Sequence, residues 1–433
     1  MSELSYLEKL LDGVEVKWLP LGNVAEIYGG LTGKSKSDFE NGNARYVSYK
    51  KIFGYLDVND YPTDYVYISE GERQNKVRYG DVLFTGSSEI ADEAGMSSAV
   101  TVHFDESVYL NSFSFGIRFS NSIKIKPEFA KYLFRTHFMR SEIAKTASGV
   151  TRFNISKSRF KKILVPIICP NDPEKSLAIQ SEIVRILDKF TALTAELTAE
   201  LTAELNMRKK QYNYYRDQLL SFKEGEVEWK TLGDVTKKWY SGGTPTAGKI
   251  EYYENGNIPW LRTQEVKFSE IDSTEIKITQ AALKNSSAKW IPRNCVIIAI
   301  SGATAGRSAI NKIPLTTNQH CGCLEIDDTK ALYRYVFHWV SFNYENIKSL
   351  GQGARGDLNS TIIKNFKLPI PYASDPQKSL KEQARIVEIL DKFDTLTNSI
   401  TEGLPREIEL RQKQYEYYRD LLFSFPKPDT VSN

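Results

Sequence analysis

The chain has 433 residues, of which 41% are hydrophobic and 12% aromatic, so it can fill real cores and is not disordered throughout. Its formal net charge of +3 neither demands nor excludes nucleic acid, because a binding protein can confine its basic residues to one face. Four cysteines give no disulfide framework, and no apolar run is long enough to span a bilayer. The charged N-terminus lacks the apolar core of a signal peptide, so a cytoplasmic chain is expected.

An internal repeat dominates the sequence. The segment 180–194 returns at 383–397 with ten of fifteen positions identical, and the segment 204–222 returns at 407–425 with twelve of nineteen identical. Both matches run at an offset of 203 residues without a gap, whereas the stretches between the copies barely align. A repeat of this kind sets the architecture, and it predicts two variable bodies that alternate with two copies of one helix.

The chain opens with a short helical piece, residues 1–12. The sequence from 5 to 18 resembles the join at 215–229, as though the repeat were circular and cut inside a helix. Such a chain can close into a pseudo-two-fold object. The first body, 13–175, contains short β-branched runs bounded by glycine, which predict many short strands. A helix is expected around 127–146.

The central copy of the repeat, 176–224, is predicted to be one helix because its apolar residues recur at spacings of three and four. It carries the tetrapeptide TAEL three times in succession, at 194–205. Alanine, glutamate and leucine are strong helix formers, so the array should continue the helix.

The second body, 225–375, is again rich in short strand-like runs, with a helix expected around 329–349. The C-terminal copy of the repeat, 376–425, contains Gly403 and Pro405 and should be kinked or broken there. A tail, 426–433, follows.

Motifs of a self-contained enzyme are missing from the sequence. GGLTGKS at 29–35 resembles a phosphate-binding loop, but only three residues separate Gly29 from Gly33 where four are needed. None of the four histidines belongs to a recognisable acid–base set. His320 lies near two cysteines without a fourth ligand group, so buried thiols are expected there and not a metal. We predict no catalytic residue, no metal and no cofactor in this chain.

Several motifs together carry a family resemblance. The second body contains SGGTPT at 241–246, NIPWLRTQEV at 257–266 and ISGATAGRSAI at 300–310, and both helix copies contain Q-x-x-IV-x-ILDKF and Q-Y-x-YYRD. With the TAEL array, these motifs resemble the specificity subunit of type I restriction–modification systems, in the subgroup with a TAEL-repeat spacer. The resemblance covers essentially the whole chain. The first body departs from it, with GGLTGKS in place of GGTP and no IPW.

The resemblance implies an α+β fold with two pseudo-repeated, strand-rich mixed α/β target recognition domains. Two long antiparallel coiled-coil helices would separate them in a circular pseudo-two-fold arrangement. It also implies a non-catalytic subunit that reads a bipartite, asymmetric sequence in double-stranded DNA and docks two modification (methyltransferase) subunits. Restriction/translocase subunits would join through those partners. S-adenosylmethionine, ATP and Mg would belong to the partners, and no membrane is involved.

The TAEL array would then set the distance between the two readers. Four helical residues add ~6 Å and ~40° of rotation, against ~3.4 Å per base pair. One TAEL unit should therefore change the preferred gap by roughly one to two base pairs. A neutral four-residue insertion in a coiled coil is the alternative.

Arginine and lysine read guanine, asparagine and glutamine read adenine, and other polar residues hold phosphates. On this chemistry, the DNA-binding candidates in the second body are Thr244, Arg262, Thr263, Gln264, Ser301, Arg307, Gln319, Arg355 and Asn359. In the first body they are Lys34, Lys36, Tyr49, Lys50, Ser87, Ser88, Arg152 and Asn154. Each has a plain alternative as a solvated or turn-stabilising residue.

Apolar residues of the two helix copies are expected to form a helix–helix seam: Ile183, Ile186, Leu187, Phe190, Ile386, Ile389, Leu390 and Phe393. Four tyrosines face either this seam or a partner subunit: Tyr212, Tyr215, Tyr415 and Tyr418. Trp18, Trp229 and Trp260 are expected to anchor cores. Two other functions stay open: a structural scaffold whose bodies bind proteins, and a nuclease fused to a coiled coil, which no carboxylate cluster supports.

Overall fold

A computed structural model describes residues 6–353, 356–399 and 402–427 of the chain. The chain divides into two compact units. The first holds the residues up to Glu200 together with those from Ile408 onward, and the second holds Leu201–Glu407. Each unit therefore contains one body and a part of both copies of the repeated helix.

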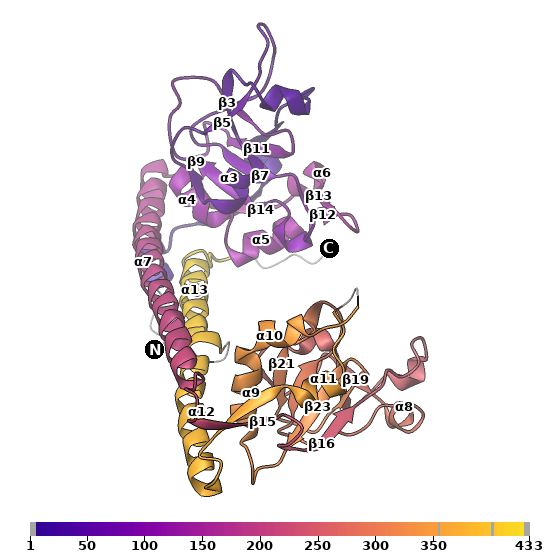
Figure 1. Cartoon of the computed structure of the whole chain (residues 1–433). Helices are drawn as coiled ribbons and strands as arrows, with labels where there is room; N and C mark the ends of the chain where they lie inside the picture. Colours follow the sequence, from indigo (N-terminus) through magenta and orange to yellow (C-terminus); the bar gives the residue numbers. More distant parts are fainter. Residues whose placement is uncertain (1–5, 354–355, 400–401, 428–433) are drawn as a thin grey trace. The chain divides into compact units, whose positions relative to one another are not determined.

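A five-stranded sheet forms the centre of the first body (Figure 1). Its order is β2 (Ala25–Gly29), β11 (Ser114–Phe119), β7 (Val82–Thr85), β9 (Ser97–Val100) and β4 (Asp57–Val58). Neighbouring strands are antiparallel except β4 and β9, which are parallel. A four-stranded sheet shares a core with it and has the order β5 (Asp64–Val66), β3 (Ala44–Val47), β10 (Val108–Leu110) and β6 (Lys76–Val77).

Smaller pairings complete the first body. One sheet has the order β12 (Ala147–Ser148), β13 (Phe153–Ile155) and β8 (Ser87–Ser88), and a ribbon joins β1 (Val16–Pro20) to β14 (Leu164–Ile168). The main core packs Phe84 of β7 against Phe115, Phe134 and Phe160, with ring centroids 5.0–5.3 Å apart. Such aromatic pairs stabilise the fold by more than the burial of their surface area alone would.

The second body repeats the central sheet and the two-stranded ribbon of the first, but in its described residues the smaller sheet lacks an equivalent of β6, and the sheet β12-β13-β8 has no equivalent. Its central sheet has the order β16 (Thr236–Ser241), β23 (Cys321–Ile326), β20 (Val296–Ala299), β21 (Ser308–Asn311) and β18 (Glu270–Ile271). Again only the last pair is parallel. Beside it are the sheet β19 (Ile276–Ile278), β17 (Ile258–Leu261) and β22 (Thr316–Thr317), and the ribbon β15 (Val227–Thr231) with β24 (Lys367–Pro371). The two bodies are therefore structural repeats although their sequences barely align.

The long helices agree with the sequence pattern. The helix α7 (Pro173–Leu219) is continuous over 47 residues and includes all three TAEL units. The C-terminal copy is broken as predicted: α12 (Pro376–Asn398) ends before α13 (Gly403–Leu422) begins. Gly403 has φ +76°, and a Cβ there would lie 2.5 Å from the carbonyl oxygen of Thr395, so the break depends on glycine.

The sequence predicted one helix near the end of each body, but the structure has a pair of short helices at each place. The stretch 127–146 forms α4 (Pro127–Leu133) and α5 (His137–Ala144), because the hydroxyl of Thr136 accepts the N–H of Met139 and caps the second helix. The stretch 329–349 forms α9 (Tyr333–Phe342) and α10 (Tyr344–Ser349). Between these two, the Asn343 amide donates to the carbonyl of Trp339 and closes the last turn of α9.

Short helices connect the remaining elements: α1 (Tyr6–Leu11), α2 (Leu21–Val24), η1 (Lys36–Phe39), α3 (Tyr49–Gly54), η2 (Ala91–Glu93), α6 (Lys157–Phe160), η3 (Ile250–Tyr252), η4 (Thr263–Glu265), α8 (Gln280–Lys284), η5 (Gly302–Thr304) and α11 (Ser360–Asn365).

The glutamine of the repeated motif ties each helix copy to its body. Gln180 accepts the N–H of Lys126, at the start of α4, at 2.8 Å. Gln383 accepts the N–H of Leu332, at the start of α9, at 2.9 Å. Both glutamines are buried, and each satisfies a backbone donor that a helix end leaves unpaired.

The aspartate of the ILDKF motif makes a second tie. Asp188 accepts the hydroxyl of Tyr132 at 2.7 Å. Its equivalent, Asp391, accepts both Arg334 (2.6 and 2.8 Å) and His338 (2.7 Å). The motif that marks the repeat in the sequence is thus the attachment point of each body.

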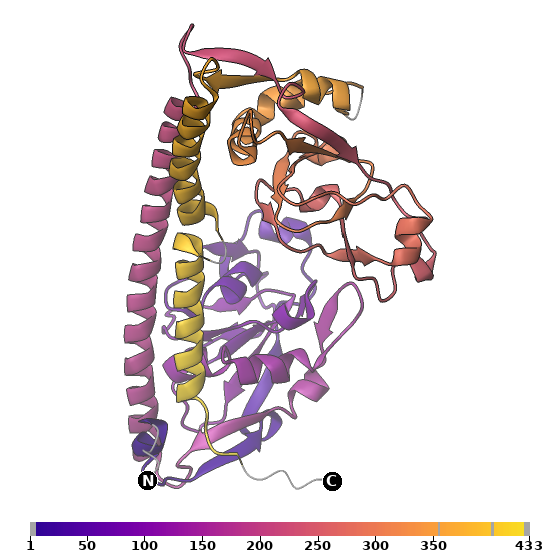
Figure 2. The ribbon, with the colours of Figure 1, turned by 90° about the horizontal axis from the view of Figure 1, so that it is seen from below.

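Within each unit, parts of the two helix copies lie side by side, as both views show (Figures 1 and 2). Phe190 stacks on Tyr418 at 5.3 Å, and Phe393 stacks on Tyr215 at 5.5 Å. The hydroxyl of Thr191 donates to that of Tyr415 at 3.1 Å. Tyr212 also packs on Phe393, with centroids 6.2 Å apart.

The aliphatic positions of the repeat also contact the bodies. Ile183 and Leu187 are fully buried in the core of the first unit, with Ile186 half-buried against it. Ile386 and Leu390 are buried in the core of the second unit, and Ile389 is half-buried. These side chains therefore join helix to body as well as helix to helix.

The three tryptophans differ in their surroundings. Trp260 is buried and anchors a core, as predicted. Trp18 is half-buried, packs edge-on against Phe138 and donates to the carbonyl of Pro426. The prediction for Trp229 was wrong: it is 49% exposed and rests on Trp339, because β15 lies in a two-stranded ribbon that offers a large ring little cover.

Candidate nucleic-acid interface

Five of the residues predicted in the first body gather where β7 ends. The Tyr49 hydroxyl donates to the carbonyl of Ser87 at 2.8 Å, and the Arg152 guanidinium donates to the Ser87 hydroxyl at 3.1 Å. Asn154 of β13 pairs with Ser87 of β8, and Ser88 is the next residue of that strand. The five residues therefore come together from three segments, with 38 residues from Tyr49 to Ser87 and 65 from Ser87 to Arg152.

Four of these five residues border a surface hollow of about 530 Å³. Tyr49, Ser87, Ser88 and Arg152 line it, together with Phe113 and two acidic residues, Glu89 and Glu93. Phe113 is 64% exposed, and the guanidinium of Arg152 lies 5.8 Å from the centre of its ring. Lys50 is exposed next to Tyr49 on α3. The hollow combines a cation, hydroxyls and an open aromatic ring, which suits contacts with base edges.

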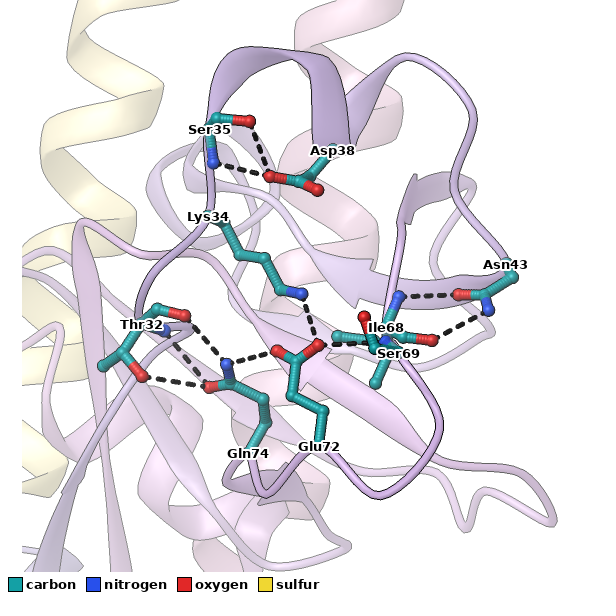
Figure 3. A network of polar contacts seen from close by, with 9 residues as sticks. All are labelled: Thr32, Lys34, Ser35, Asp38, Asn43, Ile68, Ser69, Glu72 and Gln74. Carbon is teal, nitrogen blue, oxygen red and sulfur yellow. Dashed lines mark hydrogen bonds and ion pairs between the residues drawn. The ribbon is translucent and has the colours of Figure 1, made fainter.

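Lys34 belongs to a different network (Figure 3). Its ammonium group pairs with Glu72 at 2.6 Å, and its side chain is only 6% exposed. Gln74 accepts the N–H of Thr32 and donates to its carbonyl and to Glu72. The hydrogen bond from Lys34, followed by those from Gln74 and the N–H of Ser69, lowers the pKa of Glu72 to about 2. The charge of Lys34 is thus compensated inside the loop.

Lys36 lies exposed at the start of η1, beside this network and apart from the hollow. Its helix is closed by Ser35 and Asp38, whose side chains hydrogen-bond each other at 2.6 Å. Lys34 and Lys36 were predicted from their charge, but Lys34 is paired within its own loop and neither residue lines the hollow.

In the second body, predicted residues from several segments meet where β20 ends. The Thr244 hydroxyl donates to Gln319 at 2.7 Å. The Ser301 hydroxyl is 2.6 Å from Nδ1 of His320. The backbone joins Ile300 to Leu358, beside Asn359, and Leu261, beside Arg262, to Asn318. Thr244, Ser301 and Gln319 make these side-chain contacts, and Arg262, Arg307 and Asn359 lie at or beside the joined backbone, whereas Thr263 and Gln264 follow Arg262 in η4. Arg355 lies outside the described residues.

Two of these residues also have structural partners. Arg262 is 25% exposed and pairs with Glu275 at 2.6 Å and with Glu265 at 3.8 Å. Asn359 caps α11 by accepting the N–H of Ile362 at 2.9 Å. Gln264 and Gln319 are exposed.

The two clusters occupy corresponding positions in the repeated fold. Ser87 follows the last residue of β7 by two positions, and Ser301 follows the last residue of β20 by two. The residue between, Gly86 or Ile300, accepts an N–H from Ile155 or Leu358 respectively. In each body, therefore, the cluster lies at the same end of the central sheet.

Sequence reasoning missed two residues in these clusters, Phe113 and His320. Phe113 was not singled out, and His320 was considered only as a metal ligand. The available signal was an asparagine two positions earlier in both cases, Asn111 and Asn318. The match is too short to notice in an alignment.

The cysteines near His320 are buried thiols, as expected. Burial raises the pKa of Cys321 to about 12 and that of Cys323 well above its ordinary value, so neither is a ready thiolate ligand. Over residues 6–353, 356–399 and 402–427, no group of three or more His, Cys, Asp or Glu side chains could hold a metal ion. No helix in that part of the chain is long and apolar enough to cross a membrane.

Comparison with known proteins assigns the fold and the repeat to one family. The family described as "Type I restriction modification DNA specificity domain" matches residues 13–207 and 224–410. The chain is 46% identical to the Escherichia coli type I restriction enzyme EcoR124I/EcoR124II specificity subunit, over 100% of both chains. It is 36% identical to the Escherichia coli EcoprrI specificity subunit, over 93% of both.

Solved structures agree on the fold. A chain from a structure of type I R-M complex assembly and conformational transition matches with a TM-score of 0.59 at 16% identity, covering 94% of this chain and 97% of that one. The HsdS subunit from Thermoanaerobacter tengcongensis matches with a TM-score of 0.50 at 15% identity, covering 94% and 95%. The family model and the two relatives confirm the family found in the sequence, and the chain belongs to the type I restriction–modification specificity subunits.

Proposed function

We propose that this chain gives a type I restriction–modification complex its DNA sequence specificity by reading two separate half-sites. The observation that carries the proposal is the pair of equivalent polar clusters, one at the same sheet end of each body. One scaffold used twice with different side chains suits a bipartite, asymmetric target in double-stranded DNA. We propose that residues 13–175 and 225–375 are the two target recognition domains.

The side chains of each cluster have the chemistry for base and phosphate contacts. The first body offers Arg152 in its hollow, Asn154 paired with Ser87, and the exposed Lys50 next to Tyr49. The second offers Gln264 and Gln319, with Arg262 held in position by Glu275. Since the two sets differ, the two half-sites should differ in sequence.

The repeated helix supports a second role, the docking of two identical partners. Tyr214 and its equivalent Tyr417 are 62% and 63% exposed, and Met207 and its equivalent Leu410 are 48% and 42% exposed. Residues seven apart lie on one helix face. Two surfaces with matching side chains suit two copies of one modification subunit.

The chemistry would then reside in the partners. We infer that the modification subunits bring S-adenosylmethionine and that restriction subunits bring ATP and Mg, with no cofactor in this chain. The three TAEL units inside α7 would set the gap between the half-sites. A scaffold that binds only proteins offers no reason for two equivalent polar clusters that differ in their side chains.

Binding by the purified complex with its modification subunit tests the proposal. The affinity should fall steeply with salt, because phosphate contacts release counterions. Arg152→Ala should relax discrimination in one half-site and Arg262→Ala in the other, each by about tenfold for the base concerned. Lys392→Ala, on an exposed face of α12, is the matched control. Equal losses at both half-sites from either variant would contradict independent readers.

A further inference from the structure

The two bodies contain the same small turn at the edge of the candidate interface. In the first body, the side-chain oxygen of Asn111 accepts the N–H of Phe113 at 2.9 Å. In the second, the side-chain oxygen of Asn318 accepts the N–H of His320 at 3.0 Å. An asparagine that bonds the backbone two residues on makes a defined local turn. Both turns lead directly into the second strand of the central sheet, β11 or β23.

The backbone around each turn is held by matching hydrogen bonds. The N–H groups of Asn111 and Asn318 donate to Val47 and Leu261, the last residues of β3 and β17. The carbonyls of Phe113 and His320 accept from Gly86 (2.7 Å) and Ile300 (2.9 Å). The third residue of each turn therefore has both its N–H and its carbonyl fixed.

The side chains of these third residues, in contrast, point to the surface of the cluster. Phe113 is 64% exposed on the rim of the hollow, with Arg152 over its ring. His320 is exposed, and its Nδ1 is engaged by Ser301, so Nε2 is the ring atom left to meet a ligand. A fixed backbone with an open side chain lets the residue type change without changing the turn.

We propose that Phe113 and His320 are specificity-determining residues, each choosing one base pair in the half-site that its own body reads. This inference rests on the proposed function. The apolar ring of Phe113 suits a thymine methyl group, whereas the imidazole of His320 suits a hydrogen-bonding base edge such as guanine. In both bodies the asparagine turn positions the backbone, and the side chain of its third residue contacts the base.

The test compares methylated motifs in a methylation-deficient host that carries the chain with its modification subunit. The variants are Phe113→Ala, Phe113→His and His320→Ala. Tyr79→Ala is the control, because Tyr79 is a 41% exposed aromatic residue that precedes β7, at the opposite end of the strand from Ser87. Complex assembly and the melting temperature of each variant are measured alongside.

Phe113→Ala should relax one base-pair position of the first half-site by about tenfold and leave the second half-site and the gap unchanged. His320→Ala should do the reverse, Phe113→His should exchange the preferred base, and Tyr79→Ala should change nothing. Unchanged motifs in all three variants would overturn the inference while leaving the proposed function standing. Loss of both half-sites by an assembled Phe113→His complex would also overturn it. A wild-type complex without any split motif would instead remove the proposed function itself.

Discussion

Phe190 stacks on Tyr418 with ring centroids 5.3 Å apart and an interplanar angle of 21°. The same contact recurs between their repeat equivalents, Phe393 and Tyr215, at 5.5 Å and 26°. Each pair joins the early part of one helix copy to the late part of the other, and each unit contains one pair. This exchange is what a circular repeat cut inside a helix requires.

The stacked pairs should be energetically independent of each other. We expect a double-mutant cycle on Phe190→Ala and Tyr418→Ala to give a coupling of about 1 kcal/mol, measured from the free energy of unfolding. Phe190→Ala combined with Tyr215→Ala should be additive, since these residues belong to different pairs. Strong coupling in the second cycle would contradict the pairing.

Asp391→Asn should destabilise the second unit. Burial alone would raise the pKa of Asp391, but hydrogen bonds from His338 and Arg334 outweigh burial and lower it. Asparagine keeps one acceptor oxygen but removes the charge and replaces the second oxygen with an NH2 donor, so Arg334 loses part of its ion pair, which should cost about 2 kcal/mol in denaturant unfolding. Asp188→Asn is the matched change, and its effect should be smaller because the side chain of Asp188 is 50% exposed. A larger loss for Asp188→Asn would refute the assigned roles.

Glu72 should make the first body sensitive to acid. Its pKa is lowered to about 2 from an ordinary 4.5, chiefly by the hydrogen bond from Lys34. A carboxyl with a lowered folded-state pKa contributes stability above its unfolded pKa and loses it as pH falls through the folded value. Glu72→Gln should therefore lower the melting temperature at pH 7, and the difference from wild type should shrink between pH 4.5 and 2. A difference that stays constant over that range would argue against the ion pair.

The exposed tyrosines of the repeat should govern assembly. Tyr214→Ala or Tyr417→Ala should weaken one of the two modification-subunit sites, by about tenfold in affinity for a central aromatic contact. The double variant should weaken both, as seen by analytical ultracentrifugation or mass photometry. Tyr55→Ala, a 58% exposed tyrosine in the first body, is the control. A single variant that removes both partners together would speak against two separate docking sites.

The helices were readable from the sequence because their signals are local and repeated. The offset of 203 residues, the TAEL composition and Gly403 predicted the continuous α7 and the break before α13. The shared topology of the bodies was not readable. Their strands are two to six residues long, and strand order depends on pairings between distant segments.

The candidate residues show the same limit. Lys34 was chosen for its charge, but its partner Glu72 lies 38 residues away, beyond any local pattern. Arg262 likewise meets Glu275, which lies 13 residues further along the chain. Other predicted residues do belong to the clusters, because residues near strand ends gather at the edge of a sheet. Ser87 and Arg152 belong to the cluster of the first body, and Ser301 and Gln319 to that of the second. Phe113 and His320 share only an asparagine two positions earlier in the sequence, and their equivalence lies in the turn that each asparagine makes.

Methylome sequencing of a methylation-deficient host tests the central claim most directly, with the wild-type chain and a variant that lacks one TAEL unit, both expressed with the modification subunit. We expect one split adenine-methylated motif, whose gap shortens by roughly one to two base pairs in the deletion while both half-sites stay the same. Half-sites that change with the spacer, or no motif from a complex shown to assemble and bind S-adenosylmethionine, would contradict two independent readers held apart by a helix.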